Sequence, residues 1–429
     1  MSKNKLFLKD RLRALVHENL ENIEIYNLDK KEWYLLNEKT YFVLKILENG
    51  IEKEDLFSLL ERKYGIRRET FDGLVSRLNK LGLVSYNNSR GKIYESHIEK
   101  YPLYRLQIEI TRKCNLQCIH CYNNSSPNES VELNFNSFKQ LIEETYDLGL
   151  VLVLFTGGEP FFKKDFEHFL SFLYENGIDF AILTNGFLIN EKWIDLLKKY
   201  KVKFVSISFD SFNNDEFKKI RGKENKHIKD LIKKLVLYQI PVRIGITVIP
   251  GINDKKDSIL RTYKFLQEIG INKHNILIDL VIFQGRILET KENSKLLEKS
   301  LKNLGESFKR IENAKLPRKK DSTLKGDLNY CGIGTEMLFI SADNKIFLCP
   351  LLTQEELRLG ILGKDNIRKI WKEHKLLVYF RKERHIKETK CINCNFLNYC
   401  KGGCKARSYI EYGKFNEIDS YLCYLYKNK

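Results

Sequence analysis

The sequence predicts an α/β protein built around a parallel sheet that is curled into a partial barrel. Between residues 104 and 314, six apolar runs of strand length alternate with amphipathic stretches of helical length. This alternation is typical of β–α repeats in which helices cover a buried parallel sheet. The flanking segments differ, because residues 1–95 combine short alternating runs with helical ones and residues 326–429 are rich in cysteine. We therefore expect three modules in the 429 residues.

The first module, residues 1–95, is predicted to be a winged helix, which is a hairpin followed by three helices. Residues 23–28 and 32–37 alternate like paired strands around a turn. Amphipathic stretches follow at residues 38–48, 53–64 and 69–81. Glycines stand where each of these helices is expected to end, at positions 50, 65 and 82.

The second module is predicted to span residues 100–315 and to hold the parallel sheet. Its predicted strands are residues 106–110, 150–156, 180–184, 204–209, 242–248 and 276–282. Its clearest predicted helices are residues 136–148, 165–176, 190–200 and 255–269. In barrels of this kind the chemistry takes place at the C-terminal ends of the strands.

Composition and charge exclude several classes of protein. No apolar run approaches the ~18 residues of a membrane span, and no apolar signal region follows the N-terminus, so we expect a cytoplasmic protein. The formal charge is +18, but lysine is spread evenly rather than gathered in a basic arm. Nucleic-acid binding is therefore an alternative that charge alone supports weakly. An acidic redox partner or an acidic peptide fits the same charge.

Three cysteines after the first barrel strand are the main chemical signal. Cys114, Cys118 and Cys121 are spaced Cys-x3-Cys-x2-Cys on one loop. Thiolates at this spacing can hold three corners of a [4Fe–4S] cube and leave the fourth iron without a protein ligand. An open iron can bind and transform a small molecule, whereas a fully ligated cluster only transfers electrons. Ten cysteines in a cytosolic chain also favour metal binding over disulfides.

The end of the second strand carries Gly157, Gly158 and Glu159, followed by a proline. Glycines without side chains let the backbone approach a ligand closely, and Glu159 offers a carboxylate to an ammonium group. Alone, this sequence is that of an ordinary tight turn. One β–α unit after the cysteine loop, it predicts part of a binding site.

Polar residues also follow the third and fourth strands. Asn185 ends the third strand, and Ser206, Ser208 and Asp210 share one face of the fourth by two-residue alternation. Such a face suits a polar ligand with ribose and carboxylate groups. Arg221, after the next helix, could pair with a carboxylate. Ordinary polar filling of a strand is the alternative for Ser206.

With the cysteine loop, these residues make the segment 104–290 resemble the radical S-adenosylmethionine (SAM) superfamily. The resemblance implies a partial (β/α)6 barrel and a [4Fe–4S] cluster whose open iron binds SAM. It also implies that an electron from the cluster cleaves SAM, and that the resulting 5′-deoxyadenosyl radical abstracts hydrogen from a substrate carbon. The implied cluster ligands are Cys114, Cys118 and Cys121. The implied SAM contacts are Tyr122 beside the adenine, Gly157, Gly158 and Glu159 at the methionine amino group, and Asn185, Ser208 and Arg221 at ribose or carboxylate.

The other seven cysteines are similar in order and spacing to a SPASM domain, over residues 326–429. By this resemblance, Cys391, Cys394, Cys400 and Cys423 hold one auxiliary [4Fe–4S] cluster. Cys331, Cys349 and Cys404 hold a second one, whose fourth ligand the sequence does not identify. A zinc ribbon at residues 391–404 is the alternative. Two departures are that Asn344 replaces a usual glycine, and that Pro350 follows Cys349, which disfavours formylglycine formation.

The first module resembles the PqqD-like recognition element of ribosomal-peptide maturases. That resemblance implies β-addition, in which a leader peptide pairs with an edge strand and rests apolar side chains on the third helix. A winged helix that binds DNA or only caps the barrel is the alternative.

The whole order of motifs most resembles the thioether-forming enzymes of the sactipeptide group. We therefore predict a radical SAM maturase that joins a cysteine sulfur of a ribosomally made peptide to a carbon. Its partners would be a precursor peptide with a leader and an acidic electron donor such as a flavodoxin or ferredoxin. Carbon–carbon cross-linking, epimerisation or cleavage by the same radical are alternatives, as is a nucleic-acid-binding regulator that carries zinc or a cluster. The sequence identifies no catalytic side chain that quenches the product radical.

Overall fold

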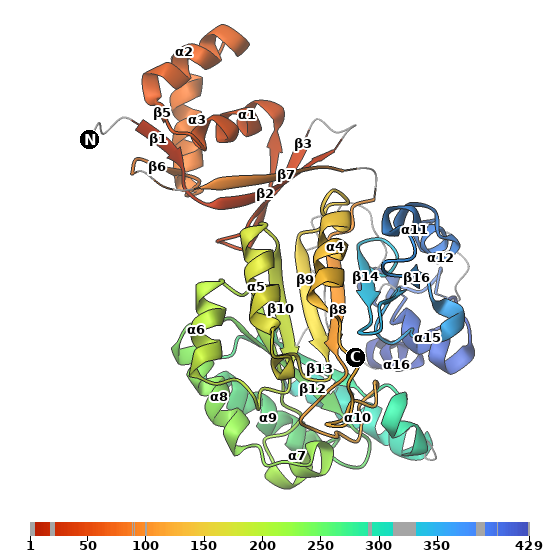
Figure 1. Cartoon of the computed structure of the whole chain (residues 1–429). Helices are drawn as coiled ribbons and strands as arrows, with labels where there is room; N and C mark the ends of the chain where they lie inside the picture. The colour runs from red at the N-terminus through yellow and green to blue at the C-terminus, as the bar shows by residue number, and fades with distance from the viewer. Residues whose placement is uncertain are drawn as a thin grey trace. The chain divides into compact units, whose positions relative to one another are not determined.

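The computed structural model describes residues 5–17, 22–87, 89, 91–98, 101–290, 294–311, 332–382, 391–400 and 402–427. The chain divides into two compact units (Figure 1). The first comprises residues 1–104, 143–151 and 172–179, and the second comprises residues 105–142, 152–171 and 180–429. Among the described residues, no helix is both long and apolar enough to span a membrane.

The first unit contains a four-stranded sheet in the order β4-β3-β2-β7. Its strands are β2 (Arg11–His17), β3 (Asn22–Asn27), β4 (Glu32–Asn37) and β7 (Lys92–Ile98). The predicted hairpin is present as β3 and β4, which pair antiparallel. Lys31 has a φ of 64° in the connecting turn. Strands β2 and β7, which pair in parallel, were not predicted, because their runs show no clear alternation. The order leaves β4 at an edge of the sheet.

Three helices follow the hairpin in the first unit, at the predicted places. They are α1 (Glu38–Leu47), α2 (Lys53–Tyr64) and α3 (Arg68–Lys80). Their apolar faces, including the fully buried Leu44, Leu60 and Phe71, pack into one core. A small sheet of β1 (Lys5–Leu8), β5 (Ile51–Glu52) and β6 (Val84–Ser85) joins this core.

The second unit is built on the predicted parallel sheet, and all six predicted strands are present. They are β8 (Arg105–Thr111), β9 (Leu152–Gly157), β10 (Asp179–Thr184), β11 (Phe204–Ser208), β12 (Val242–Val248) and β13 (Ile276–Leu280). They lie side by side in chain order. Neighbouring strands therefore deliver their C-terminal loops to one edge of the sheet.

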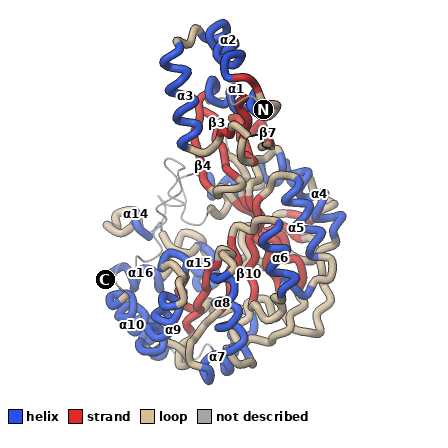
Figure 2. The backbone as a smooth tube through the Cα atoms, turned by 90° about the vertical axis from the view of Figure 1, so that its left-hand side faces the viewer, coloured by secondary structure: helices blue, strands red, loops and turns tan. Residues whose placement is uncertain are grey.

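In the described part of the chain, helices cover one face of the parallel strands. On β11, Val205 and Ile207 are fully buried under helices, whereas Ser206 and Ser208 on the other face are half-buried. We call the second face the inner face. The helices are α4 (Phe135–Tyr146), α5 (Phe166–Glu175), α6 (Glu191–Lys199), α7 (Asn214–Arg221), α8 (Lys226–Leu237), α9 (Lys256–Glu268) and α10 (Ser294–Arg310). Figure 2 shows α5, α6 and α8 on the outside of the strands. Short 3-10 helices are η1 (Pro160–Phe162), η2 (Lys273–Asn275) and η3 (Gly285–Thr290).

The cysteine-rich segment extends the same sheet, which the sequence did not predict. β14 (Met337–Ile340) pairs in parallel with β8, and β15 (Lys345–Phe347) and β16 (Gly360–Ile361) follow as antiparallel neighbours. Asn344 adopts a φ of 65° in the β14–β15 turn, so it takes the left-handed conformation expected of a residue replacing glycine. The remaining elements are η4 (Glu355–Leu357), α11 (Ile367–Glu373), α12 (Lys375–Arg381), α14 (Leu397–Cys400), α15 (Lys405–Tyr412) and α16 (Ser420–Lys427).

Candidate functional site

The loop that leaves β8 gathers its three cysteines into one apolar cluster. Cys114 and Cys118 are buried and Cys121 is half-buried, and all three pack with Leu116 and Phe187. The loop turns tightly, because the Cys121 N–H donates to the Cys118 carbonyl at 3.2 Å. The structure therefore brings together the three thiols that the sequence assigned to one cluster.

An arginine that the sequence analysis missed holds this loop. Arg286 donates from Nη1 to the Cys118 carbonyl at 2.6 Å and from Nη2 to the Ser125 carbonyl at 2.9 Å. Its own N–H donates to the Cys121 carbonyl at 3.1 Å. Gly285 makes this approach possible, since a Cβ at that position would lie 2.4 Å from the Cys121 oxygen. In the sequence, only the glycine–arginine pair just after the sixth predicted strand could have indicated this role of Arg286.

Gly157 and Gly158 contact the backbone that leads to Cys114. A Cβ on Gly157 would lie 2.3 Å from the Thr111 oxygen, and one on Gly158 would lie 2.3 Å from the Lys113 oxygen. The Gly158 N–H donates to the Thr111 carbonyl at 2.7 Å. Gly157 also has a φ of +143°, which favours glycine. The missing side chains therefore serve the fit between this turn and the cysteine loop, before any ligand is considered.

Glu159 is fully buried and its carboxylate is already occupied. It accepts hydrogen bonds from the Thr184 hydroxyl at 2.7 Å, the Asn185 N–H at 2.8 Å and the Phe161 N–H at 3.2 Å. Burial raises the pKa of Glu159 to about 7, and the three donors oppose that rise. The sequence analysis predicted that this carboxylate binds an ammonium group. In the structure it instead accepts hydrogen bonds from Thr184 and Asn185, at the C-terminal end of β10. Glu159 thus orients Asn185.

Asn185 and Arg221 place N–H groups on the sulfurs of the cysteine loop. The Asn185 amide donates to Cys114 Sγ at 3.6 Å and to Asn115 Oδ1 at 2.8 Å. Arg221 Nη1 donates to Cys118 Sγ at 3.6 Å. Hydrogen bonds to cluster sulfurs tune the reduction potential of an iron–sulfur cluster. The site therefore includes both residues, with contacts to thiols that the sequence did not anticipate.

Arg221 is held by an internal carboxylate. Its Nε donates to Asp210 Oδ2 at 2.6 Å, and Asp210 also accepts from the Thr247 N–H at 3.0 Å. Burial alone would lower the pKa of Arg221, but Asp210 and Cys118 raise it, so the guanidinium stays charged. The Arg221–Asp210 pair therefore connects the C-terminal end of α7 with β12.

Ser208 and Tyr122 lie on the side of the site that faces the sheet interior. Ser208 is on the inner face and pairs in register with Gly245, where a Cβ would meet no atom of the described residues within 4 Å. The Tyr122 phenol bonds to Thr156, and burial followed by the nearby Glu109 raises its pKa. The inner face thus has open space beside Ser208.

The inner face also carries an arginine, Arg243, which lies two residues before Gly245 on β12. Arg243 pairs in register with Ser206, and its guanidinium stacks 3.8 Å from the Phe204 ring centroid. Burial lowers the pKa of Arg243. Within the described ranges no carboxylate forms an ion pair with it. The inner face therefore presents a positive charge next to the open space at Gly245.

A buried carboxylate on β8 connects the cysteine loop with the cysteine-rich segment. Glu109 accepts from the Ala342 N–H at 2.9 Å, from the Asn123 amide and from Arg112 Nε at 3.3 Å. Arg112 also donates to Asp343 at 3.0 Å. The sequence analysis missed this network, because Ala342 and Asp343 lie more than 200 residues beyond Glu109 and Arg112 along the chain.

Four of the C-terminal cysteines line one hollow. They are Cys391, Cys394, Cys400 and Cys423, together with apolar residues that include Leu422 and Tyr426. These are the four that the sequence assigned to one auxiliary cluster. Cys331, assigned to the other cluster, lies outside the described residues.

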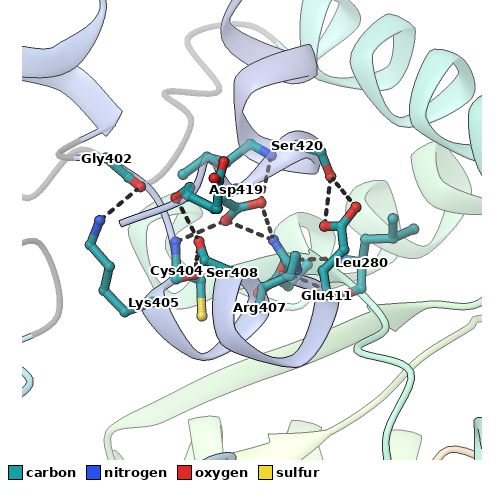
Figure 3. Close-up of polar contacts among 12 residues, drawn as sticks. Leu280, Gly402, Cys404, Lys405, Arg407, Ser408, Glu411, Asp419 and Ser420 are labelled. Carbon is teal, nitrogen blue, oxygen red and sulfur yellow. Dashed lines mark hydrogen bonds and ion pairs between the residues drawn. The ribbon is translucent and has the colours of Figure 1, made fainter. Parts of the chain in front are cut away.

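Cys404 is fixed by a buried ion pair (Figure 3). Its N–H donates to Asp419 Oδ2 at 2.8 Å, and Arg407 Nη1 donates to the same carboxylate at 3.1 Å. Arg407 Nη2 reaches Asp279 at 3.2 Å and the Leu280 carbonyl at 3.4 Å, at the end of β13. Figure 3 shows the Cys404 thiol pointing away from Asp419. The pair thus orients this thiol relative to the parallel sheet.

The donor set fits iron–sulfur clusters. Nine cysteines are free thiols in the described part of the chain. In the same residues, no three His, Cys, Asp or Glu side chains converge on one point as ligands of a single metal ion do. Seven of the thiols lie instead in two groups, four around a hollow at residues 391–423 and three along the loop at residues 114–121. Thiolates are the ordinary ligands of such clusters.

Comparison with known families identifies the class of protein. Residues 108–278 match the radical SAM superfamily, and residues 331–395 match SPASM, an iron–sulfur cluster-binding domain. The chain is therefore a radical SAM enzyme that carries a SPASM domain. Its cofactors are SAM, the [4Fe–4S] cluster that binds it, and auxiliary clusters.

Two curated proteins are similar over most of this chain. The antilisterial bacteriocin subtilosin biosynthesis protein AlbA of Bacillus subtilis is 27% identical over 335 residues, which cover 74% of this chain and 70% of AlbA. The AdoMet-dependent heme synthase of Methanosarcina barkeri is 26% identical over 345 residues, which cover 74% of this chain and 95% of that protein.

Solved structures share the fold. Streptococcus suis SuiB bound to its precursor peptide SuiA matches with a TM-score of 0.65 and 18% identity, over 97% of this chain and 99% of SuiB. The enzyme anSMEcpe with bound AdoMet and the Cp18Cys peptide matches with a TM-score of 0.59 and 19% identity, over 76% of this chain and 95% of that chain.

We predict that Gly158→Ala removes the SAM-binding cluster and spares the auxiliary clusters. The added Cβ would lie 2.3 Å from the Lys113 oxygen and 2.6 Å from the Arg112 oxygen, so the backbone before Cys114 must move. Iron bound after anaerobic reconstitution should fall by about four atoms per chain. Gly73→Ala is the control, since Gly73, like Gly158, has no positive φ, and its Cβ would meet no described atom within 4 Å. Equal iron in both variants would contradict this role.

We also predict that Asp419→Ala destabilises the SPASM region. It leaves the buried Arg407 without its main partner and the Cys404 N–H without an acceptor. Breaking a buried pair in this way costs about 3–5 kcal/mol. The unfolding midpoint and the retained auxiliary iron should both fall. Asp279→Ala, which removes the partner whose side chain is 77% exposed, should cost much less. A smaller loss in Asp419→Ala than in Asp279→Ala would show that the pair has no such role.

Proposed function

We propose that this enzyme matures a ribosomally made peptide, by joining a cysteine sulfur of the peptide to one of its carbons. The observation that carries the proposal is one chain with a three-thiol loop, seven further cysteines in SPASM order and an N-terminal unit with an open sheet edge. The fold likeness to SuiB over nearly the whole chain and the similarity to AlbA support a peptide as the substrate class.

Within the site, the chain's own residues would hold SAM and shield it. When bound, the cluster and SAM supply a 5′-deoxyadenosyl radical that can abstract hydrogen from an unreactive carbon. Asn185 and Arg221 would keep the thiolates oriented through their N–H···S contacts. Glu159 would act as a positioning residue, so that the backbone of Gly157 and Gly158 meets the amino group. Ser208 would face the ribose from the inner face.

The inner face would receive the part of the peptide that is modified. Gly245 leaves open space beside Ser208, and Arg243 lies one residue pair further along the same face. A carbon placed there would lie next to the SAM contacts. Cys349 and Cys404 belong to the SPASM region, and with Cys331 they would hold the auxiliary cluster that has only three thiolates. A vacant iron in that cluster could bind the substrate thiolate that is to be joined to carbon.

The first unit would bind the leader as a PqqD-like element. β4 is an edge strand, so its outer backbone groups can pair with an added strand. Trp33 and Leu35 on this strand are 39% and 62% exposed, which leaves apolar surface for the leader. The Trp33 ring is anchored against Tyr26 at a centroid distance of 5.0 Å.

Other outcomes of the same radical stay open as alternatives, namely carbon–carbon cross-linking, epimerisation and cleavage. The similarity to a heme synthase raises a tetrapyrrole substrate, but such a substrate offers no role for the open edge of β4. A DNA-binding regulator would leave the glycine fit at Gly157 and Gly158 unexplained.

Anaerobic reconstitution tests the radical function. The wild-type protein should bind about twelve irons in three cubes and, with dithionite and SAM, form 5′-deoxyadenosine. Cys121→Ala should lose about four irons and all SAM cleavage, whereas Cys423→Ala should lose auxiliary iron only. Stoichiometric zinc without SAM cleavage would favour the regulator.

Co-expression with a short peptide encoded in a neighbouring reading frame, followed by mass spectrometry of the peptide, identifies the product. A mass loss of about two hydrogens at a cysteine, with no free thiol left to alkylate, would be expected for a thioether. A modified peptide with its thiols intact would contradict the thioether and favour the alternatives.

We further predict that Leu35→Asp weakens leader binding. Losing the burial of a leucine costs about 1.5–3 kcal/mol, which is roughly a ten- to hundredfold rise in Kd. Fluorescence anisotropy with the labelled leader measures it, and SAM cleavage with dithionite should not change. Leu237→Asp, at a leucine that is 78% exposed on α8, is the matched control. Unchanged leader affinity in Leu35→Asp would refute docking on β4.

A further inference from the structure

Only a thin layer of side chains separates the cysteine loop from solvent near the start of α8. Phe187 packs against the three cysteines on one side. On its other side its ring stacks on His227, with centroids 5.6 Å apart and planes at 14°. Lys223 Nζ lies 5.4 Å from the centroid of the same ring. Because His227 and Lys223 are exposed, one aromatic pair spans the distance from surface to cluster site.

The segment that contains His227 and Lys223 is rich in lysine. Residues 215–234 contain seven lysines against four acids, and the one arginine is paired with Asp210. Five of the lysines are exposed, and we call them the α7–α8 basic surface: Lys218, Lys219, Lys223, Lys226 and Lys233. α8 also begins at Lys226, so the positive end of its dipole adds to the field at the same place. The structure therefore combines a short route to the cluster with attraction for an anionic partner.

We propose that the α7–α8 basic surface is the docking site of a small acidic electron-transfer protein, and that Phe187 and His227 lie on the electron's route to the cluster. This inference rests on the proposed radical function. One electron leaves the reduced donor, which is oxidised, and the cluster held at the cysteine loop is reduced by it. The docking step itself breaks no bond and moves no proton. Electron tunnelling falls off exponentially with distance, so a donor must approach where the covering layer is thin.

Charge complementarity selects this class of partner. Opposite charge across an interface speeds diffusional encounter by about 10- to 1,000-fold, and salt screens the effect. A transient redox contact needs a fast encounter and fast release more than tight binding. Exposed lysines allow both fast encounter and fast release, because each is hydrated and contributes little to affinity by itself.

The test uses the reconstituted holoenzyme, a reduced flavodoxin as the donor and dithionite as a small reductant. In the double variant Lys223→Glu/Lys226→Glu, the second-order rate constant for cluster reduction by flavodoxin should fall about tenfold or more at low salt. Its dependence on ionic strength should also flatten. The dithionite-driven formation of 5′-deoxyadenosine should stay within about twofold of the wild type, which shows that the site is intact.

Two control variants make the result specific. Lys223→Arg/Lys226→Arg keeps the charge and should keep the flavodoxin rate. Lys364→Glu/Lys369→Glu makes the same charge change at exposed lysines of the SPASM region and should have little effect. Equal rates in the wild type and the Lys223/Lys226 glutamate variant would overturn the proposal, as would weakened precursor binding with an unchanged flavodoxin rate. No SAM cleavage with dithionite in the wild type would instead refute the radical function itself.

Discussion

The structure of the second unit depends on strand β8 being paired on both sides. β9 pairs in parallel along one edge of β8 and β14 along the other. Because the backbone of β8 is saturated in this way, the loop that leaves it starts from a fixed point. That loop carries Cys114, Cys118 and Cys121. Glu109, on the same strand, adds bonds to the loop through Asn123 and to the β14–β15 turn through Ala342.

The sequence predicted local features better than distant ones. The six strands and the cysteine spacing are encoded within short windows, where apolar runs and fixed intervals are visible. The β8–β14 pairing joins segments more than 200 residues apart, and no local pattern indicates such a contact. Arg286 was missed because the residues that it contacts lie far from it in the sequence, and the residues next to it form no recognisable motif. Its role is evident only where its guanidinium meets the carbonyls of Cys118 and Ser125.

The Gly-Gly-Glu sequence shows that a motif assigned to ligand binding can have a role in the fold as well. Read as a ligand motif, Gly157, Gly158 and Glu159 were assigned to SAM. In the structure, the glycines admit the backbone at Thr111 and Lys113, and the glutamate is satisfied inside the protein. Packing against a backbone and contact with a ligand select the same residue types, so the assignment of these three residues to SAM stays a prediction beside their observed role in the fold. The sequence alone could not show the packing role, because the backbone that the glycines contact, at Thr111 and Lys113, lies on another segment of the chain.

The continuous sheet from β13 to β16 also has a kinetic consequence. A hydrogen-bonded lattice of nine strands does not hinge in its middle, and Arg407 fastens the far end of the SPASM region back to β13. The sheet and the contacts of Arg407 thus fix the cysteine loop after β8 and the segment around Cys404 to the same rigid frame. A reaction that used groups on both sides of this frame would therefore require the substrate to move between them, because the strands cannot close on each other.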